Sequence, residues 1–241
     1  TDDEIRAIKK IHIIACGSAY HTGVTAKYVF EGLARIPVEV DLASEFRYRN
    51  PILEEGEMVI IVSQSGETAD SLAALRLAKE RGVRTLGIVN VVGSSIAREA
   101  DNVMYTWAGP EIAVATTKAY SCQLVAEYLL ALKFAQARGT INQEQLTEYL
   151  QIEMLPNQIE SLLGNRERIQ KFANRYVAAK DVFFIGRGID YAISLEGSLK
   201  LKEISYIHSE AYAAGELKHG TISLIEDGTL VTAVVTQEDL Y

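Results

Sequence analysis

The 241-residue sequence is poor in the residues that define several classes of protein. It has only two cysteines, Cys16 and Cys122, each inside an apolar or helical run. Two such cysteines cannot form the framework of a disulfide-rich secreted protein, so a reducing cytoplasm is the expected compartment. The first ten residues are charged and contain no apolar core, which predicts no signal peptide. No apolar run approaches the roughly 18 residues of a membrane helix.

Positive charge is also scarce. The sequence has 24 lysines and arginines against 32 aspartates and glutamates, which gives a formal net charge of −8. Without a block rich in Lys and Arg, the chain is a poor candidate for binding nucleic acid or an anionic membrane. Apolar residues make up 48% of the chain, enough for the core of one large domain or of two small ones.

Short apolar runs alternate with helical patterns along the first 140 residues. The expected strands are 11–16, 37–43, 58–62, 83–89 and 102–106. The expected helices cover about 23–33, 72–82 and 117–138. Nearly continuous apolar strands between helices predict a parallel sheet that is covered on both faces, which is a three-layer α/β fold.

The chain is expected to have three parts. These are a first domain over 1–140, a polar helical connector over 141–180 with breaks at Pro156 and Gly164, and a second domain over 181–241. The second domain begins like the first, because "HIIACGSAY" matches "FFIGRGIDY", "ASEF" matches "HSEAY" and "MVIIVSQ" matches "LVTAVVTQ". A single match could arise by chance, but three in one order favour duplication, and the first copy continues for roughly seventy residues beyond the last match. We therefore expect the second copy to be incomplete.

Hydroxyl groups line the end of the third expected strand. The segment "SQSGET" supplies Ser63, Gln64, Ser65 and Thr68 just before a helix. Anions bind at the carboxyl ends of parallel strands and at helix N-termini, and Gly66 lets the backbone approach one closely. Glu67 is expected to point away and to stabilise the first turn of its own helix. An ordinary helix cap is the alternative, although it needs one hydroxyl and not three. Neither a P-loop nor a dinucleotide motif is present.

Two further polar elements accompany this loop. In "EIAVATTKAY", Thr116 and Thr117 precede a long helix, so that two turns on neighbouring strands could converge on one ligand. In the second domain, Glu196, Lys200 and Glu203 share one helical face. Such a stripe is usually a solvated salt-bridge face, but against a pocket it could supply a proton-transfer base.

The histidines divide into candidates and structural residues. His219, in the turn "GELKHGT", could act as an acid or base near neutral pH. His12 and His21 fall on the first strand and its helix and are interpreted as structural, whereas His208 has no assigned role. Glu216 and His219 form an E-x-x-H pair, but no Cys/His cluster supports a metal site, so no metal is expected.

Together, "SQSGETADS", "ASEFRYR", "PEIAVATTKAY" and "LEGSLKLKEISYIHSEAYAAGELKHG" resemble the isomerase half of the glutamine–fructose-6-phosphate aminotransferase (glucosamine-6-phosphate synthase) family. The resemblance implies tandem flavodoxin-like SIS domains and a homodimer without a cofactor. It also implies conversion of fructose 6-phosphate and glutamine-derived ammonia to glucosamine 6-phosphate, a step towards UDP-N-acetylglucosamine.

The resemblance also implies a role for individual residues. The phosphate would be held by Ser63, Gln64, Ser65 and Thr68, and the sugar would be contacted by Cys16, Gly17, Ser18, Val114 and Thr116. Glu203 would move a proton between C1 and C2, with Lys200 beside it. His219 would open the sugar ring from the neighbouring subunit.

Two departures from the family pattern matter. The first turn reads "CGSA" where the family commonly has C-G-T-S, so Ala19 lacks a hydroxyl whose hydrogen bond to a charged group is worth about 1.5–3 kcal/mol. The glutaminase domain and the C-terminal tail with its Schiff-base lysine are not in this sequence. The chain alone is therefore expected to bind weakly and to be inactive. An SIS-domain phosphosugar-binding regulator and a fructosamine-phosphate deglycase are the alternative functions.

The second copy is not expected to bind a phosphate. Its "VVTQEDLY" has Glu238 and Asp239 where the first copy has Ser65 and Gly66. Two carboxylates at this place would repel an anion. The sequence therefore predicts one phosphate site, in the first copy, and an acid–base helix in the second.

Overall fold

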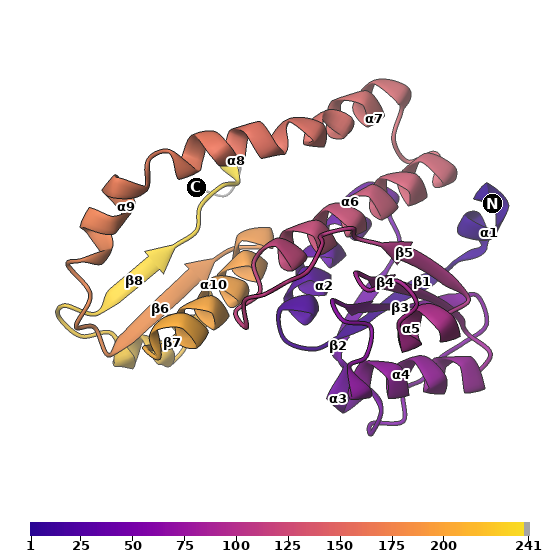
Figure 1. Cartoon of the computed structure of the whole chain (residues 1–241), viewed down its shortest axis with the longest axis horizontal. Helices are drawn as coiled ribbons and strands as arrows, with labels where there is room; N and C mark the ends of the chain where they lie inside the picture. Colours follow the sequence, from indigo (N-terminus) through magenta and orange to yellow (C-terminus); the bar gives the residue numbers. More distant parts are fainter. Residues whose placement is uncertain (239–241) are drawn as a thin grey trace. The chain divides into compact units, whose positions relative to one another are not determined.

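A computed structural model describes residues 1–238 and divides the chain into two compact units (Figure 1). The first unit is Thr1–Ile141 and the second begins at Asn142. Each unit has a parallel sheet of its own, and residues 142–180 of the expected connector belong to the second unit.

The first unit contains a five-stranded sheet in the order β2-β1-β3-β4-β5, and every neighbouring pair is parallel. The strands are β1 (Lys10–Ala15), β2 (Val38–Leu42), β3 (Glu57–Ser63), β4 (Arg84–Val89) and β5 (Asn102–Tyr105). The central strands are almost entirely buried, which is why they read as continuous apolar runs.

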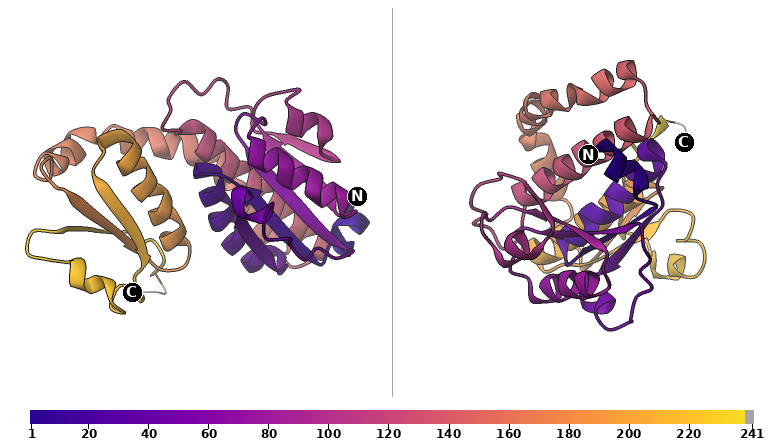
Figure 2. Two further views of the ribbon diagram at one scale, coloured as in Figure 1. Left: turned by 90° about the horizontal axis from the view of Figure 1, so that it is seen from below. Right: turned by 90° about the vertical axis from the view of Figure 1, so that its right-hand side faces the viewer.

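Helices cover both faces of this sheet, as the further views in Figure 2 show. They are α1 (Asp2–Ala7), α2 (Ser18–Val29) with a π-helical turn (Phe30–Ala34), α3 (Ala43–Phe46), α4 (Ala69–Glu80), α5 (Ser95–Glu99) and α6 (Lys118–Arg138). Helices α2 and α6 share one hydrophobic cluster with Ile11 and Ile13 of β1, while α3, α4 and α5 share the other with Ile14. The expected three-layer α/β fold is confirmed.

The second unit starts with helices that are mostly exposed. They are α7 (Gln143–Tyr149), a 3₁₀ segment (Leu150–Met154), α8 (Leu155–Leu163) and α9 (Arg166–Ala173). A three-stranded parallel sheet follows in the order β7-β6-β8, built from β6 (Asp181–Gly186), β7 (His208–Ala213) and β8 (Leu230–Ala233). Helix α10 (Ile189–Ser205) connects β6 to β7 and packs on both.

The two sheets repeat one plan. In each, the first strand lies between the second and the third, which gives β2-β1-β3 and β7-β6-β8. The helix after the first strand is capped in the same way, by Gly17 (φ 58°, ψ −132°) and by Gly188 (φ 53°, ψ −125°). The internal similarity read from the sequence therefore corresponds to a structural repeat.

One of the three sequence matches was misplaced by an element. "ASEF" forms α3, which follows β2, whereas "HSEAY" lies within β7 itself. The segment that directly follows β7 is Ala214–Leu217, and it occupies the place after the second strand that α3 occupies in the first unit. A short Ser-Glu match cannot distinguish a strand from the turn behind it.

Candidate functional site

The candidate site is built at the carboxyl ends of neighbouring strands in the first unit. Strand β1 ends at Ala15 and β3 at Ser63, and the two strands are hydrogen-bonded neighbours. The segments that follow them therefore lie at the same edge of the sheet, where open parallel α/β sheets bind ligands. They carry two groups of predicted residues, namely Cys16, Gly17 and Ser18 after β1, and Gln64, Ser65 and Thr68 after β3.

The hydroxyls of the "SQSGET" loop have different environments. Ser63 is 3% exposed, and its Oγ lies 3.1 Å from Thr68 Oγ1 and accepts the Gly66 N–H at 3.0 Å. Ser65 Oγ accepts the Glu67 N–H at 3.2 Å. Ser63 thus braces the loop from inside, while Ser65 and Thr68, both partly exposed, keep hydroxyl protons that can be donated to a ligand.

Helix α4 begins at this loop without a side-chain cap. Thr68 is its N-cap residue, but its side chain makes no capping hydrogen bond. The ordinary-cap alternative is therefore not what the structure has. The one acidic residue of the first turn, Asp70, is paired with Arg47 at 2.8 Å. The first N–H groups of α4 and the positive end of its dipole are left available to an anion.

Glu67 does not stabilise its own helix, in contrast to the expectation from the sequence. Its Oε1 accepts the N–H of Ser95, the first residue of α5, at 2.7 Å. Hydrogen bonding by Ser95, first through its side chain and then through its backbone N–H, holds the pKa of the Glu67 carboxyl below its usual range. The side chain does point away from α4, because it binds the neighbouring β4–α5 segment.

The first turn completes this edge of the sheet. Gly17 caps α2, and Ser18 and Ala19 are both 9% exposed at the start of that helix. Cys16 Sγ lies 3.9 Å from the Oγ of Ser71 in α4. The turn after β1 thus lies beside the first turns of α4.

The loop before α6 differs from the sequence-based interpretation. Thr116 Oγ1 donates to Glu111 Oε2 at 3.1 Å, and the N–H groups of Thr117 and Ala119 reach the same oxygen, each at 3.2 Å. These bonds, first those from the Ala119 and Thr117 backbone, lower the pKa of Glu111. A carboxylate of the chain therefore occupies the N-terminus of α6, which is not a second open anion site. Val114 is 98% exposed in the same loop.

The predicted acid–base stripe is a connected group on α10. Lys200 Nζ lies 3.5 Å from Glu196 Oε1 and is also paired with Glu203 Oε2. The three side chains share one helical face, as their spacing predicted. The exposed fractions of the side chains are 7% for Glu196, 21% for Lys200 and 32% for Glu203. The stripe is therefore neither a fully solvated salt-bridge face nor a fully buried one.

His219 lies in the turn after β7 and is exposed, and its backbone N–H donates to Glu216 O at 2.9 Å. Within residues 1–238, no hydrogen bond or ion pair joins its side chain to the α10 group. The chain thus places the "SQSGET" loop in its first unit, and Lys200, Glu203 and His219 in its second.

The second unit has its own carboxylate at the sheet edge that corresponds to the "SQSGET" loop of the first unit. Thr236 takes the place of Ser63 in the repeat, and its N–H and O–H donate to Asp190 at 3.0 and 2.5 Å. Asp190 is only 4% exposed and lies in the first turn of α10. The sequence instead predicts two repelling carboxylates here, Glu238 and Asp239. Asp239 lies outside the described residues. The only sequence signal for Asp190 is its position two residues after Gly188.

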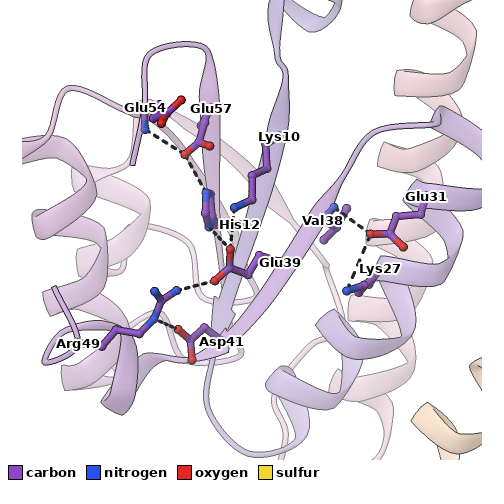
Figure 3. A network of polar contacts seen from close by, with 10 residues as sticks. All are labelled: Lys10, His12, Lys27, Glu31, Val38, Glu39, Asp41, Arg49, Glu54 and Glu57. Atoms are coloured by element: carbon purple, nitrogen blue, oxygen red, sulfur yellow. Dashed lines mark hydrogen bonds and ion pairs between the residues drawn. The ribbon is translucent and has the colours of Figure 1, made fainter. Parts of the chain in front are cut away.

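His12 is structural, as interpreted from the sequence. Its Nε2 lies 2.9 Å from Glu57 Oε2 and its Nδ1 lies 3.8 Å from Glu39 Oε2, within the network that Figure 3 shows. Arg49 extends this network through Glu39 and Asp41. The network joins β1, β2 and β3 at the first half of β1, away from the loops that follow the strands.

The described part of the chain shows neither a metal cluster nor a membrane span. Over residues 1–238, no group of three or more His, Cys, Asp or Glu side chains could hold a metal ion. In the same range, no helix has the length and the apolar character needed to cross a membrane.

Comparisons with known proteins agree with this architecture. The SIS domain model matches residues 4–133 and 176–240. The chain is 61% identical to the glutamine–fructose-6-phosphate aminotransferase (isomerizing) of Caldanaerobacter subterraneus, covering 100% of this chain and 40% of that protein. It is 62% identical to the enzyme of that name from Clostridium tetani, covering 99% of this chain and 40% of that protein. The chain thus spans about two fifths of the length of these relatives.

Solved structures with sugar-phosphate enzyme names share the fold of this chain. The C-terminal domain of glucosamine-fructose-6-phosphate aminotransferase from Francisella tularensis has a TM-score of 0.96 and 39% identity, covering 99% of this chain and 68% of that chain. Glucosamine-6-phosphate deaminase from Thermotoga maritima has a TM-score of 0.74 and 28% identity, covering 93% and 67%.

The fold and the site define a parallel α/β protein with a hydroxyl-lined loop at the start of an uncapped helix. The chain belongs to the SIS domain family. The resemblance drawn from its motifs, to the isomerase half of the isomerizing glutamine–fructose-6-phosphate aminotransferases, is confirmed by these relatives.

Proposed function

We propose that this chain is the sugar-phosphate isomerase part of a glutamine–fructose-6-phosphate aminotransferase, which forms glucosamine 6-phosphate from fructose 6-phosphate and glutamine-derived ammonia. The observation that carries the proposal is the "SQSGET" loop, whose hydroxyls lie at the uncapped N-terminus of α4. The names and the high identity of the relatives support this substrate class.

In this proposal the first unit binds the substrate. Ser65 and Thr68 donate hydrogen bonds to the phosphate, Gln64 adds its amide and Ser63 braces the loop. Cys16, Gly17 and Ser18 in the first turn and Val114 and Thr116 in the loop before α6 contact the sugar. A phosphate monoester is thus held by neutral donors and a helix dipole instead of a lysine.

The second unit supplies the acid–base groups. Glu203 takes a proton from one of the carbons C1 and C2 and returns it to the other, and its ion pair with Lys200 fixes its position. His219, exposed in its turn, opens the sugar ring in the neighbouring subunit of a homodimer. We further propose that residues 181–241 belong to a second SIS domain, which the repeated strand order supports.

Location and cofactor use complete the proposal. We place the protein in the cytoplasm, which the two free cysteines, Cys16 and Cys122, support. Proton transfer by carboxylate and imidazole groups requires no cofactor or metal. A purely sugar-sensing SIS protein would have no use for the Lys200–Glu203 pair, so this pair favours the enzyme.

Two substitutions test the two halves of the proposal separately. Thr68→Val keeps the side-chain shape but removes a donor to a charged group, so we expect glucosamine 6-phosphate to bind roughly 10- to 100-fold more weakly in calorimetric titration. Glu203→Gln is expected to leave that affinity within about twofold, because the residue acts on carbon-bound protons. In the full-length gene product it should slow solvent-deuterium exchange into fructose 6-phosphate by about 100-fold or more.

Ser161→Ala is the matched control, because it removes an exposed hydroxyl on α8 and should change neither measurement. Absence of binding by the unsubstituted protein would contradict the proposal. Binding that survives in Thr68→Val would reassign the phosphate, and unchanged exchange in Glu203→Gln would remove Glu203 as the base.

A further inference from the structure

The phosphate-binding loop contains a negative charge that a phosphate site would not be expected to tolerate. Glu67 is exposed and directly precedes the N-cap residue of α4. A carboxylate this close to a bound phosphate would weaken binding if it faced the same space. The structure gives it a partner of its own, the N–H of Ser95, at 2.7 Å.

The β4–α5 segment holds the loop at three points. The Asn90 N–H donates to Gln64 O at 3.1 Å, the Ile96 N–H donates to Gly66 O at 3.0 Å, and the Ser95 N–H donates to Glu67 Oε1. Of the acceptors, only Glu67 uses a side chain. Of the three contacts, the one made by Glu67 can therefore be removed by replacing a side chain of the loop, without altering the backbone of the loop.

The packing of the two segments leaves little room for other arrangements. A Cβ on Gly66 would lie 2.1 Å from Ser94 Oγ, so the loop and the β4–α5 segment are in direct contact. Ser94 is 3% exposed, which makes this contact part of the interior. The hydrogen bond from Ser95 of α5 to Glu67 therefore also fixes the neighbouring Ser65 and Thr68 at the N-terminus of α4.

The electrostatics favour the same arrangement. The N–H groups at the start of α5 offset the charge of Glu67 locally. The side chain of Ser95 and then its backbone N–H lower the pKa of Glu67, which favours the carboxylate form that accepts these hydrogen bonds. The N-terminus of α4, in contrast, has no side-chain cap and remains for the ligand.

We propose that Glu67 is a positioning residue for phosphosugar binding: its carboxylate fastens the "SQSGET" loop to α5 and thereby presents Ser65, Thr68 and the first N–H groups of α4 to the phosphate. The inference rests on the proposed function, because it concerns the same loop. It assigns to Glu67 no contact with the substrate.

Calorimetric titration with glucosamine 6-phosphate, at a temperature where every variant is folded, tests the proposal. Glu67→Ala removes the acceptor, and we expect affinity to fall by about 5- to 10-fold, the size expected for loss of a helix cap and of preorganisation. Glu67→Gln keeps an oxygen that can accept the Ser95 N–H and should retain affinity within about twofold. Glu80→Ala, the same change at the exposed far end of α4, is the matched control and should bind like the unsubstituted protein.

Removing the donor tests the same contact from the other side. Ser95→Pro deletes the N–H at the first position of α5, where proline is compatible with a helix, and Ser94 already has the extended backbone (ψ 165°) that precedes proline. It also removes the Ser95 hydroxyl, so it is compared with Ser95→Ala, which loses the hydroxyl and keeps the N–H. Ser95→Pro should weaken binding at least as much as Glu67→Ala, because the carboxylate then stays near the ligand without its partner. Adding Glu67→Ala to it should weaken binding no further.

If the unsubstituted protein binds glucosamine 6-phosphate and Glu67→Ala binds it equally well or more tightly, the positioning role is overturned. Additive losses in the double variant would also overturn it, since they would show that the two groups act independently. A lower melting temperature with unchanged affinity would mean that the contact is structural only. If the unsubstituted protein does not bind, the proposed function fails and this inference fails with it.

Discussion

Carboxylates in the loops and first helical turns of both units accept hydrogen bonds from backbone N–H groups. Glu67 accepts from Ser95, Glu111 from Thr117 and Ala119, and Asp190 from Thr236. Each of them fills a place at a helix start or a strand end where an external anion could otherwise bind. The carboxylate in the first turn of α4, Asp70, is paired with Arg47 instead, which leaves the N-terminus of α4 without such an internal acceptor, as the proposed phosphate site requires.

One further carboxyl group makes stability depend on pH. Glu127 of α6 is fully buried, and neither of its oxygens has a hydrogen-bond partner in the described part of the chain. Burial raises its pKa from 4.5 to about 8, and the nearby Thr22 hydroxyl, which donates to Ala19 O, offsets this only slightly. The group is therefore protonated, and neutral, in the folded protein at pH 7.

A raised folded-state pKa means that the stabilising contribution is complete below pH 4.5 and is lost as the pH rises to about 8. We expect Glu127→Gln to match the unsubstituted protein near pH 5 and to exceed it in free energy of unfolding above pH 8, by up to about 4–5 kcal/mol. Urea denaturation at pH 5, 7 and 8.5 measures this. A difference that does not grow with pH would contradict the shift, and Glu148→Gln on exposed α7 is the control.

At the scale of elements, the loops after the strands carry the special backbone geometry. Gly17 and Gly188 cap the first helices of the two repeats, which lets α2 begin at Ser18, five residues before the helical pattern becomes apparent at Gly23. Gly66 has φ 67° and lies against Ser94. Glycine is needed here for two reasons, because the backbone is left-handed and because the "SQSGET" loop packs closely against the segment that contains Ser94.

Gly66→Ala and Gly82→Ala separate these two effects. Gly82 at the end of α4 has φ 73°, and an added Cβ would meet nothing within 4 Å, so the substitution should cost only about 1–2 kcal/mol in free energy of unfolding. Gly66→Ala adds the collision with Ser94 and should cost about 1–3 kcal/mol more. Chemical denaturation compares the two, and Ser94→Gly should recover part of the additional loss. Equal losses of free energy of unfolding in the two variants would show that the two loops move apart easily to accommodate the added Cβ.

At the scale of the whole molecule, the two units differ in how much core they contain. The two large hydrophobic clusters lie entirely within the first unit and include both faces of its five-stranded sheet. In the second unit, helices α8 and α9 expose large apolar side chains such as Leu162, Leu163, Ile169 and Phe172. The first unit is thus the more self-sufficient part.

Residues 1–141 produced alone are therefore expected to unfold in a single cooperative transition, with the same midpoint by circular dichroism and by calorimetry. Residues 142–241 alone should unfold at a lower temperature and bind a hydrophobic dye. Non-coincident transitions for 1–141, or dye binding in its native state, would contradict the assignment of the core to the first unit.

Sequence pattern determined the fold class, the strand positions of the first unit and the loop that follows β3, because continuous apolar runs, helical periodicity and clustered hydroxyls are local signals. The spacing of Glu196, Lys200 and Glu203 likewise predicted one helical face. The destinations of Glu67, Glu111 and Asp190 were decided only by tertiary structure. Their partners lie on other elements or across a loop, since Glu67 binds α5 and Asp190 binds Thr236 in the segment that follows β8, 46 positions away. Such contacts depend on how parallel strands bring separate loops to one edge, and no local pattern encodes that.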